Sequence, residues 1–153
     1  RPGGVTLEAL RDVLGDIRVY EASDSKPKSP GMKYRHYAPD AKVIVVEGDE
    51  EIIPIEIKAM ASRFAAQGKK VGIMATSENL RFYGDNHLVK LVGDKKDLST
   101  IAANLFSHLR SFDDIGVDII LAEGVVPKGL GFAIMNRLKR AAGGNVVKAG
   151  LGC

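Results

Sequence analysis

Strand-like and helix-like segments alternate along most of this chain, and that alternation predicts an α/β fold. Short runs of branched apolar residues are followed by segments of about a dozen residues whose apolar positions recur at helical spacing, which is the pattern of parallel strands joined by helical crossovers. Gly, Pro, Asp or Ser stands near most changes from one pattern to the other. We therefore predict a Rossmann-like, three-layer domain with a mainly parallel sheet of about five strands, preceded by an extended linker.

The N-terminal part lacks this regularity, and we divide it in two. In residues 1–20, Thr6 is expected to cap a short helix that stops at Gly15, and residues 17–20 alternate like a brief edge strand. In residues 21–41, Ser, Lys, Pro and Gly dominate and no periodicity survives. This second segment is therefore predicted to be a linker.

The regular domain is predicted to run from residue 42 to residue 153. Asp97 is placed to cap its second helix. Parallel sheets bind ligands beyond the carboxyl ends of their strands, and these ends are 47–48, 76–78 and 123–124. The full expectation is strands at 43–46, 71–75, 88–92, 117–122 and 146–149, with helices at 53–67, 97–112 and 131–142.

The composition is that of an ordinary soluble globular chain, with 45% hydrophobic and 27% charged residues. No stretch approaches the roughly 18 consecutive apolar residues of a membrane-spanning helix, and the N-terminus lacks the pattern of a signal peptide. The only cysteine, Cys153, cannot form an internal disulfide or a cysteine-based metal site. We expect a cytoplasmic protein with no membrane partner and, because residue 1 is Arg, a fragment of a longer chain.

The net charge of +3 conceals two basic segments on a weakly acidic body. Residues 25–39 hold four basic and no acidic residues, and residues 124–153 hold five basic and no acidic residues. Such segregation indicates contact with anions at particular places, and it does not suggest a general coat for nucleic acid.

Residues 29–39 form the most informative segment of the chain. Its two prolines and one glycine exclude a regular helix or a central strand. Between them lie cationic and aromatic side chains with no carboxylate to neutralise them: Lys33, Tyr34, Arg35, His36 and Tyr37. Because Arg and Lys pair with phosphate while Tyr and His stack on a base, a nucleotide or phosphoryl compound fits this segment. A solvated linker is the alternative, although disordered linkers are poor in aromatic residues.

Segment 29–39 closely resembles the interdomain linker of the long-form threonylcarbamoyl-AMP synthases. Those proteins join a YrdC-type catalytic domain to a smaller C-terminal α/β domain. Residues 1–6 resemble the end of that catalytic domain, and residues 129–138 are similar to a helix start near the family's C-terminus. The three matches occur in family order and extend over nearly the whole chain.

The resemblance implies a role within a larger enzyme. Such a parent joins threonine, bicarbonate and ATP, with Mg²⁺ accompanying the ATP, into threonylcarbamoyl-adenylate and releases pyrophosphate. The product serves a downstream threonylcarbamoyl-transferase complex in forming threonylcarbamoyladenosine in tRNA, which makes tRNA an indirect partner. On this interpretation the YrdC-type domain is the missing partner, the linker and the 42–153 domain act as lid or regulator, and the fragment alone is inactive and binds no cofactor tightly.

The resemblance also implies which residues meet substrate or nucleotide in the full-length context. The cationic side chains would neutralise polyphosphate, and the phenols would cover the adenine or exclude water. The implied set is Arg1, Ser29, Lys33, Tyr34, Arg35, His36 and Tyr37.

Within the regular domain, the turn from Gly129 to Gly131 is a candidate phosphate loop, because glycines before a helix let backbone N–H groups approach a phosphate. A strand-to-helix turn is the better explanation, since Ile134 stands where the dinucleotide fingerprint has its third glycine.

No other motif in residues 42–153 predicts catalysis or metal binding. His87 and His108 lack metal-ligand spacing, and Asp113-Asp114 is more typical of a turn than of an acid/base pair. A solvated polar helix face is expected for Asn136, Arg137, Lys139 and Arg140.

Two alternatives to the role within an enzyme remain open at this point. The α/β domain is alternatively a stand-alone binding module for a phosphorylated small ligand or a partner protein. It is also conceivable as a tRNA-contacting domain that uses its basic C-terminal third.

Overall fold

The computed structural model describes residues 4–15, 38–85 and 87–150. The strand expected at 17–20 and most of the linker expected at 21–41 lie outside these ranges. The elements are α1 (Leu7–Leu14), β1 (Lys42–Gly48), α2 (Ile53–Ala66), β2 (Val71–Thr76), the 3₁₀ turn η2 (Leu80–Phe82), β3 (Leu88–Gly93), α3 (Leu98–Ile115), β4 (Ile119–Glu123), α4 (Leu130–Ala141) and β5 (Val146–Ala149).

Local signals in the sequence account for where the helices begin and end. The Thr6 side chain accepts a hydrogen bond from Ala9 N (3.1 Å), and the Asp97 side chain accepts one from Ser99 N (3.2 Å), so both predicted caps are confirmed. Gly15 and Gly116 follow α1 and α3 with positive φ values of 77° and 70°, which a glycine adopts without strain.

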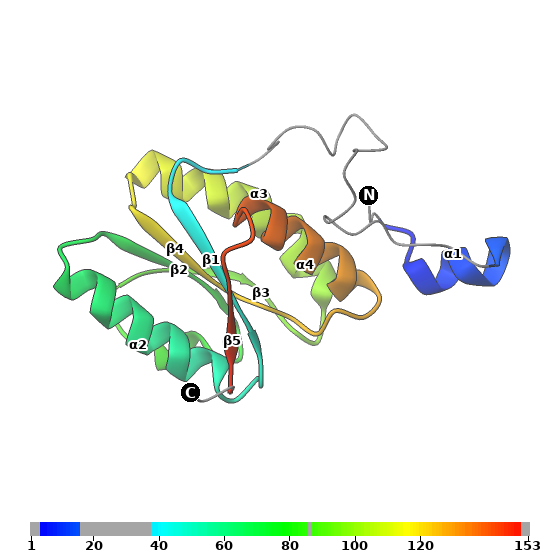
Figure 1. Cartoon of the computed structure of the whole chain (residues 1–153), viewed down its shortest axis with the longest axis horizontal. Helices are drawn as coiled ribbons and strands as arrows, with labels where there is room; N and C mark the ends of the chain where they lie inside the picture. Colours follow the sequence, from blue (N-terminus) through cyan, green and yellow to red (C-terminus); the bar gives the residue numbers. More distant parts are fainter. Residues whose placement is uncertain (1–3, 16–37, 86, 151–153) are drawn as a thin grey trace.

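The five strands form one sheet in the order β3-β2-β4-β1-β5, and every neighbouring pair is parallel (Figure 1). The predicted α/β fold is therefore confirmed, with a sheet that is wholly parallel. The fourth strand begins at Ile119, two residues later than expected. Val117 does not yet pair in the sheet, and its N–H donates a hydrogen bond to Phe112 O of the preceding helix α3 (3.2 Å).

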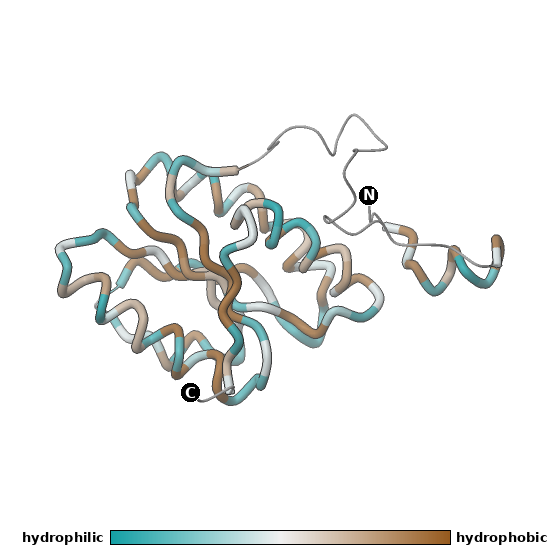
Figure 2. Tube along the Cα trace, viewed as in Figure 1, coloured by the Kyte–Doolittle hydropathy of each residue, from teal (hydrophilic) through white to brown (hydrophobic). Residues whose placement is uncertain are grey.

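Helices cover both faces of the sheet. One hydrophobic core joins the sheet to α3 and α4, and a second joins it to α2 and the loop that carries Tyr83. Figure 2 shows the hydrophobic residues concentrated along the central strands, with hydrophilic residues on the outer sides of the helices. The central residues of β1, β2 and β4 are buried throughout, as expected for parallel strands covered on both sides.

The connections leave the two central strands in opposite directions. From β1 the chain crosses β4 by way of α2 on one face, and from β4 it crosses β1 by way of α4 on the other face. Because they run in opposite directions over opposite faces, the two crossings have the same hand, as the handedness rule for parallel units requires. The carboxyl ends of β1 and β4 therefore border a topological switch point, where doubly wound sheets hold their ligands.

The start of the domain is fixed on α3. Asp113 Oδ1 accepts hydrogen bonds from the backbone N–H groups of Asp40 (3.0 Å) and Ala41 (3.4 Å). Beside this contact lies a small hollow of about 120 Å³, lined by Ala38, Pro39, Phe106, Leu109, Arg110 and Asp113. The role of Asp113 is thus to anchor the chain where it enters β1, and not only to close a helix.

Within the described part of the chain, no helix combines the length and apolar character needed to cross a membrane.

Candidate functional site

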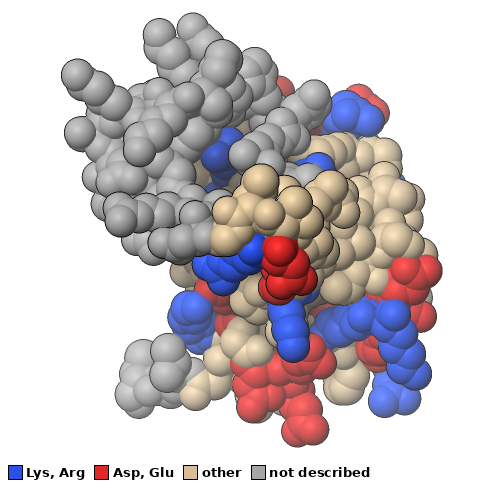
Figure 3. All heavy atoms as spheres, turned by 90° about the vertical axis from the view of Figure 1, so that its right-hand side faces the viewer, with Lys and Arg blue, Asp and Glu red and all other residues tan. Residues whose placement is uncertain are grey.

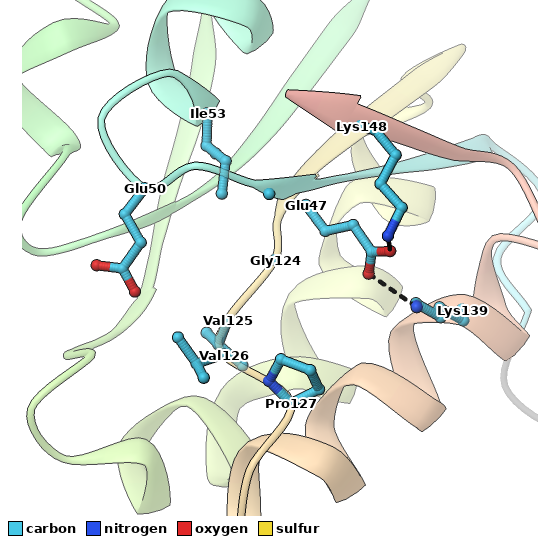
Figure 4. A pocket seen from close by; sticks show the side chains of 10 residues that line it. Glu47, Glu50, Ile53, Gly124, Val125, Val126, Pro127, Lys139 and Lys148 are labelled. Carbon is cyan, nitrogen blue, oxygen red and sulfur yellow. Dashed lines mark hydrogen bonds and ion pairs between the residues drawn. The ribbon is translucent and has the colours of Figure 1, made fainter. Parts of the chain in front are cut away.

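A cavity of about 400 Å³ opens at the switch point between β1 and β4 (Figure 4). Its apolar lining residues are Ile53 and the 125–127 segment that follows β4. Its charged lining residues are Glu47, Glu50, Lys139 and Lys148, and Gly48 and Gly124 complete it. Of the three strand ends named from the sequence, 47–48 and 123–124 contribute lining residues, whereas no residue of 76–78 lines this cavity.

Two glycines let the backbones approach closely at this edge. A Cβ atom on Gly124 would lie 2.9 Å from Val46 O, and one on Gly48 would lie 2.4 Å from Ala149 O. Gly48 also has a φ of 128°, which L side chains rarely adopt. A larger residue at either position would displace the strand ends that frame the cavity.

Glu47 is the centre of the charged side of the cavity. Its side chain is 11% exposed and forms an ion pair with Lys139 Nζ at 2.8 Å and a hydrogen-bonded ion pair with Lys148 Nζ. The two lysines come from different elements: Lys139 from α4, and Lys148 from β5, where it is the register partner of Glu47. Figure 4 shows both ammonium groups directed at the one carboxylate.

The environment of Glu47 keeps it ionised. Burial by itself raises the pKa of this carboxyl, but the hydrogen bonds and charges of Lys139 and Lys148 outweigh burial, so the pKa lies below its ordinary value of 4.5. A charged carboxylate between two ammonium groups is therefore the stable state at neutral pH.

Glu50 stands apart from this cluster and has its own partner. Its carboxylate lies 4.0 Å from Lys95 Nζ, and the Lys95 side chain is only 13% exposed. In Figure 4 the Glu50 side chain lies across the cavity from the two lysines. Since Lys95 balances Glu50, the side of the cavity formed by Glu47, Lys139 and Lys148 keeps one uncompensated positive charge.

A second buried carboxylate, Glu123, ends the neighbouring strand β4. It accepts hydrogen bonds from three side chains: Tyr83 Oη (2.6 Å), Thr76 Oγ1 (2.7 Å) and Asn79 Nδ2 (3.0 Å). Burial and the adjacent Glu123 carboxylate raise the pKa of Tyr83 well above its ordinary value, so the phenol stays a proton donor. This cluster joins β2, β4 and the η2 loop and does not line the cavity.

The residues of the N-terminal tail and the linker that were predicted to bind substrate or nucleotide lie outside the described ranges: Arg1, Ser29, Lys33, Tyr34, Arg35, His36 and Tyr37. Their proposed contacts stay predictions.

The two glycines of the candidate phosphate loop have steric roles. Gly129 has a φ of 57°, and a Cβ atom on Gly131 would lie 2.1 Å from Val126 O. The N–H groups of Gly131 and Phe132 donate to the carbonyls of Lys128 (3.0 Å) and Gly129 (3.2 Å). A tight strand-to-helix turn accounts for the glycines, and phosphate binding by this loop stays a prediction.

The histidines and the basic helix also have definite surroundings. His108 Nε2 is 2.8 Å from Leu91 O, a contact that joins α3 to β3. Among the described residues, no group of three or more His, Cys, Asp or Glu side chains is placed to hold a metal ion. The solvated face expected on α4 is only partly observed, since Lys139 pairs with Glu47 and the Arg137 guanidinium lies 5.9 Å from the Phe106 ring centre.

These contacts weaken the idea of a basic surface for tRNA. Lys139 and Lys148 belong to the basic segment 124–153, yet both are directed at Glu47. On the face shown in Figure 3, Lys and Arg lie among Asp and Glu wherever side chains are visible. The spacing of residues along the sequence did not predict this pairing, because Glu47 and Lys148 are 101 positions apart.

The fold and the site together define the class of this protein. It is a doubly wound α/β domain with a charged cavity of ligand size at its switch point. Residues 5–143 match the family described as "Threonylcarbamoyl-AMP synthase, C-terminal domain". The chain belongs to this family, as segment 29–39 suggested.

Curated relatives extend the match to nearly all of the chain. A threonylcarbamoyl-AMP synthase of Pyrococcus abyssi is 46% identical over 152 residues, which are 97% of this chain and 43% of that protein. One from Bacillus subtilis is 42% identical over 151 residues, covering 97% of this chain and 42% of the relative. The chain therefore spans less than half the length of these relatives.

Solved structures support the same assignment. The P. abyssi protein Sua5 complexed with L-threonine superposes with a TM-score of 0.85 at 45% identity, over 97% of this chain and 43% of that one. A C-terminal Sua5 domain from Pyrococcus horikoshii gives a TM-score of 0.59 at 41% identity, over 73% of this chain and all of that one.

Proposed function

We propose that this chain is the C-terminal part of an enzyme that makes threonylcarbamoyl-adenylate from threonine, bicarbonate and ATP, with release of pyrophosphate. The observation that carries the proposal is the 46% identity to a threonylcarbamoyl-AMP synthase across 97% of the chain. The structure of a relative with L-threonine bound supports threonine as a substrate. The adenylate would feed a threonylcarbamoyl-transferase that modifies tRNA in the cytoplasm, and the chain alone would be inactive because the YrdC-type domain carries the chemistry.

Within that enzyme, we assign the linker the role of a lid over the active site. Lys33, Arg35 and His36 would neutralise the polyphosphate of Mg-ATP, and a tyrosine of the segment would exclude water. Exclusion of water matters because a mixed carbamic–phosphoric anhydride hydrolyses readily, and a closing segment prevents this loss. Ser29 and Arg1 would complete the set of nucleotide and substrate contacts.

A fixed anchor at one end of the linker supports this role. A segment that closes over a site needs one end held while the rest moves. Asp113 holds the backbone of Asp40 and Ala41 on α3, directly before β1. The 42–153 domain would thus act as the base from which the linker reaches the nucleotide.

The test uses the full-length enzyme with Arg35→Ala and His36→Ala. Each variant should lower adenylate formation or increase hydrolysed product by about tenfold to a hundredfold, the effect of losing one charge-assisted hydrogen bond of about 1.5–3 kcal/mol. Pyrophosphate release and threonylcarbamoyl-adenylate yield are measured side by side. Folding should be unaffected in both variants, because loop residues contribute little packing.

Lys58→Ala is the matched control, because Lys58 is an exposed cation on α2. Lys95 would be an unsuitable control, because its side chain is 13% exposed and paired with Glu50. Wild-type values for both Arg35→Ala and His36→Ala would reduce the linker to a tether.

A further inference from the structure

We propose that the cavity at the switch point of this domain binds a small organic anion, whose carboxylate or phosphate lies against Lys139 and Lys148 and whose apolar body lies against the 125–127 segment. This proposal does not depend on the function proposed above. The lining residues that carry it are described residues of the 42–153 domain.

The first argument is the location and size of the cavity. In an open parallel sheet, the crevice between strands whose crossovers leave to opposite faces is the usual ligand site, and β1 and β4 are such a pair. The volume of about 400 Å³ falls within the range of small-molecule sites.

The second argument is the sign of the charge. Two lysines and two glutamates line the cavity. Glu50 pairs with Lys95, which is not a lining residue, whereas Lys139 and Lys148 share Glu47. One positive charge is left over at the shared carboxylate. An anion therefore fits this side of the cavity, whereas a metal cation would meet ammonium groups there.

The third argument is the unused donor capacity of the two lysines. An ammonium group has three N–H donors, and each of these lysines contacts one carboxylate oxygen of Glu47. Their side chains are 42% and 58% exposed, so both remain accessible from the cavity. Glu47 positions both heads at the cavity and at the same time competes with an incoming anion for them.

The body of the ligand is defined by the apolar lining residues of the cavity. These are Ile53, Val125 and Pro127, together with Val126, which is 58% exposed. An aliphatic group placed there would be removed from water at roughly 25 cal/mol per Å² of apolar surface. The combination selects a branched aliphatic acid or phosphate ester over a bare inorganic ion.

Three probes with the same aliphatic body separate the contributions: isopentyl phosphate, isocaproate and isopentylamine. Dissociation constants are measured by NMR titration of the 153-residue chain, following the amides of Gly48, Gly124 and Val125. Both anions should bind and shift these amides, and isopentylamine should not. If only isopentyl phosphate or only isocaproate binds, that result identifies whether the cavity accepts a phosphate or a carboxylate head group.

Variants give effects of opposite sign. Lys139→Met and Lys148→Met keep an unbranched apolar stem but remove the ammonium group, and should each weaken binding of the anions about tenfold. Glu47→Gln removes the competing charge and should tighten binding of isopentyl phosphate about tenfold, with a smaller gain for the monoanion isocaproate. Lys58→Met, at an exposed position on α2, is the matched control and should leave both affinities unchanged.

The lysine variants should weaken anion binding and Glu47→Gln should tighten it, so the proposal stays testable even if one lysine variant folds poorly. If Lys139 and Lys148 serve only to neutralise Glu47, then Glu47→Gln will not create tighter anion binding. Equal binding of isopentylamine and the anions, no shift at the three amides for wild type and Glu47→Gln, or anion affinities that ignore both lysine variants would each overturn the proposal.

Discussion

Two glutamates end neighbouring strands of the same sheet, yet they are stabilised in different ways. Glu47 ends its buried stretch on β1 between two lysines that are themselves substantially exposed, and it lines a cavity. Glu123 ends β4 in contact with three neutral donors and is 3% exposed. The first carboxylate is balanced by charge at an open site, and the second by hydrogen bonds in a closed one. We infer that Glu47 serves ligand binding and that Glu123 serves rigidity.

The difference predicts unequal losses of stability. Glu123→Ala leaves the hydroxyls of Tyr83 and Thr76 and the amide of Asn79 buried without their acceptor, and should lower the free energy of unfolding by about 3 kcal/mol or more. Glu47→Ala should cost about 1 kcal/mol or less, because the freed lysines are exposed enough to be hydrated. Urea denaturation of both variants makes the comparison, and equal losses would contradict it.

Removing a single donor tests the closed cluster more gently. Tyr83→Phe keeps the ring in its core position and deletes only the hydroxyl that donates to Glu123 at 2.6 Å. We expect a loss of about 2 kcal/mol in the free energy of unfolding, the usual contribution of a hydrogen bond to a charged group. Phe82→Leu, on the exposed side of η2, is a nearby control for a change in an aromatic residue. A Tyr83→Phe variant as stable as wild type would show that the hydroxyl is dispensable.

The open site should respond to acid. The pKa of Glu47 is lower in the folded chain than its ordinary value of 4.5, so below that value the unfolded state binds more protons and stability falls as the pH falls. Glu47→Gln lacks this contribution. The free-energy difference between wild type and Glu47→Gln should therefore be larger at about pH 7 than at about pH 3. A difference that does not change between the two pH values would mean that the lysines do not favour the charged carboxylate.

Much of the fold was predictable because its signals are local. Four branched residues at 43–46 indicate a buried strand, and Thr6 and Asp97 cap the helices that follow them. The order of the strands was not predictable, since it depends on which crossovers pass over which neighbours. The sequence also favoured a mainly parallel sheet, and the structure shows every neighbouring pair parallel, including β5 with β1 at the edge.

The charged cluster was harder to predict than the fold. The pairing of Glu47 with Lys148 follows from the register of β1 and β5, and the approach of Lys139 follows from the packing of α4. Neither is encoded in the spacing of residues along the chain. A usable signal did exist, because Glu47 and Glu123 are carboxylates that directly end two buried apolar runs. Such a position requires a partner for each carboxylate from elsewhere in the fold.

The central claim is that one carboxylate belongs to a binding site and the other to the framework. The most direct measurement is the dissociation constant of isopentyl phosphate for wild type, Glu47→Gln and Tyr83→Phe under the same conditions. The account predicts about tenfold tighter binding to Glu47→Gln and an unchanged value for Tyr83→Phe. Unchanged or weaker binding to Glu47→Gln, or an equal change in both variants, would contradict it.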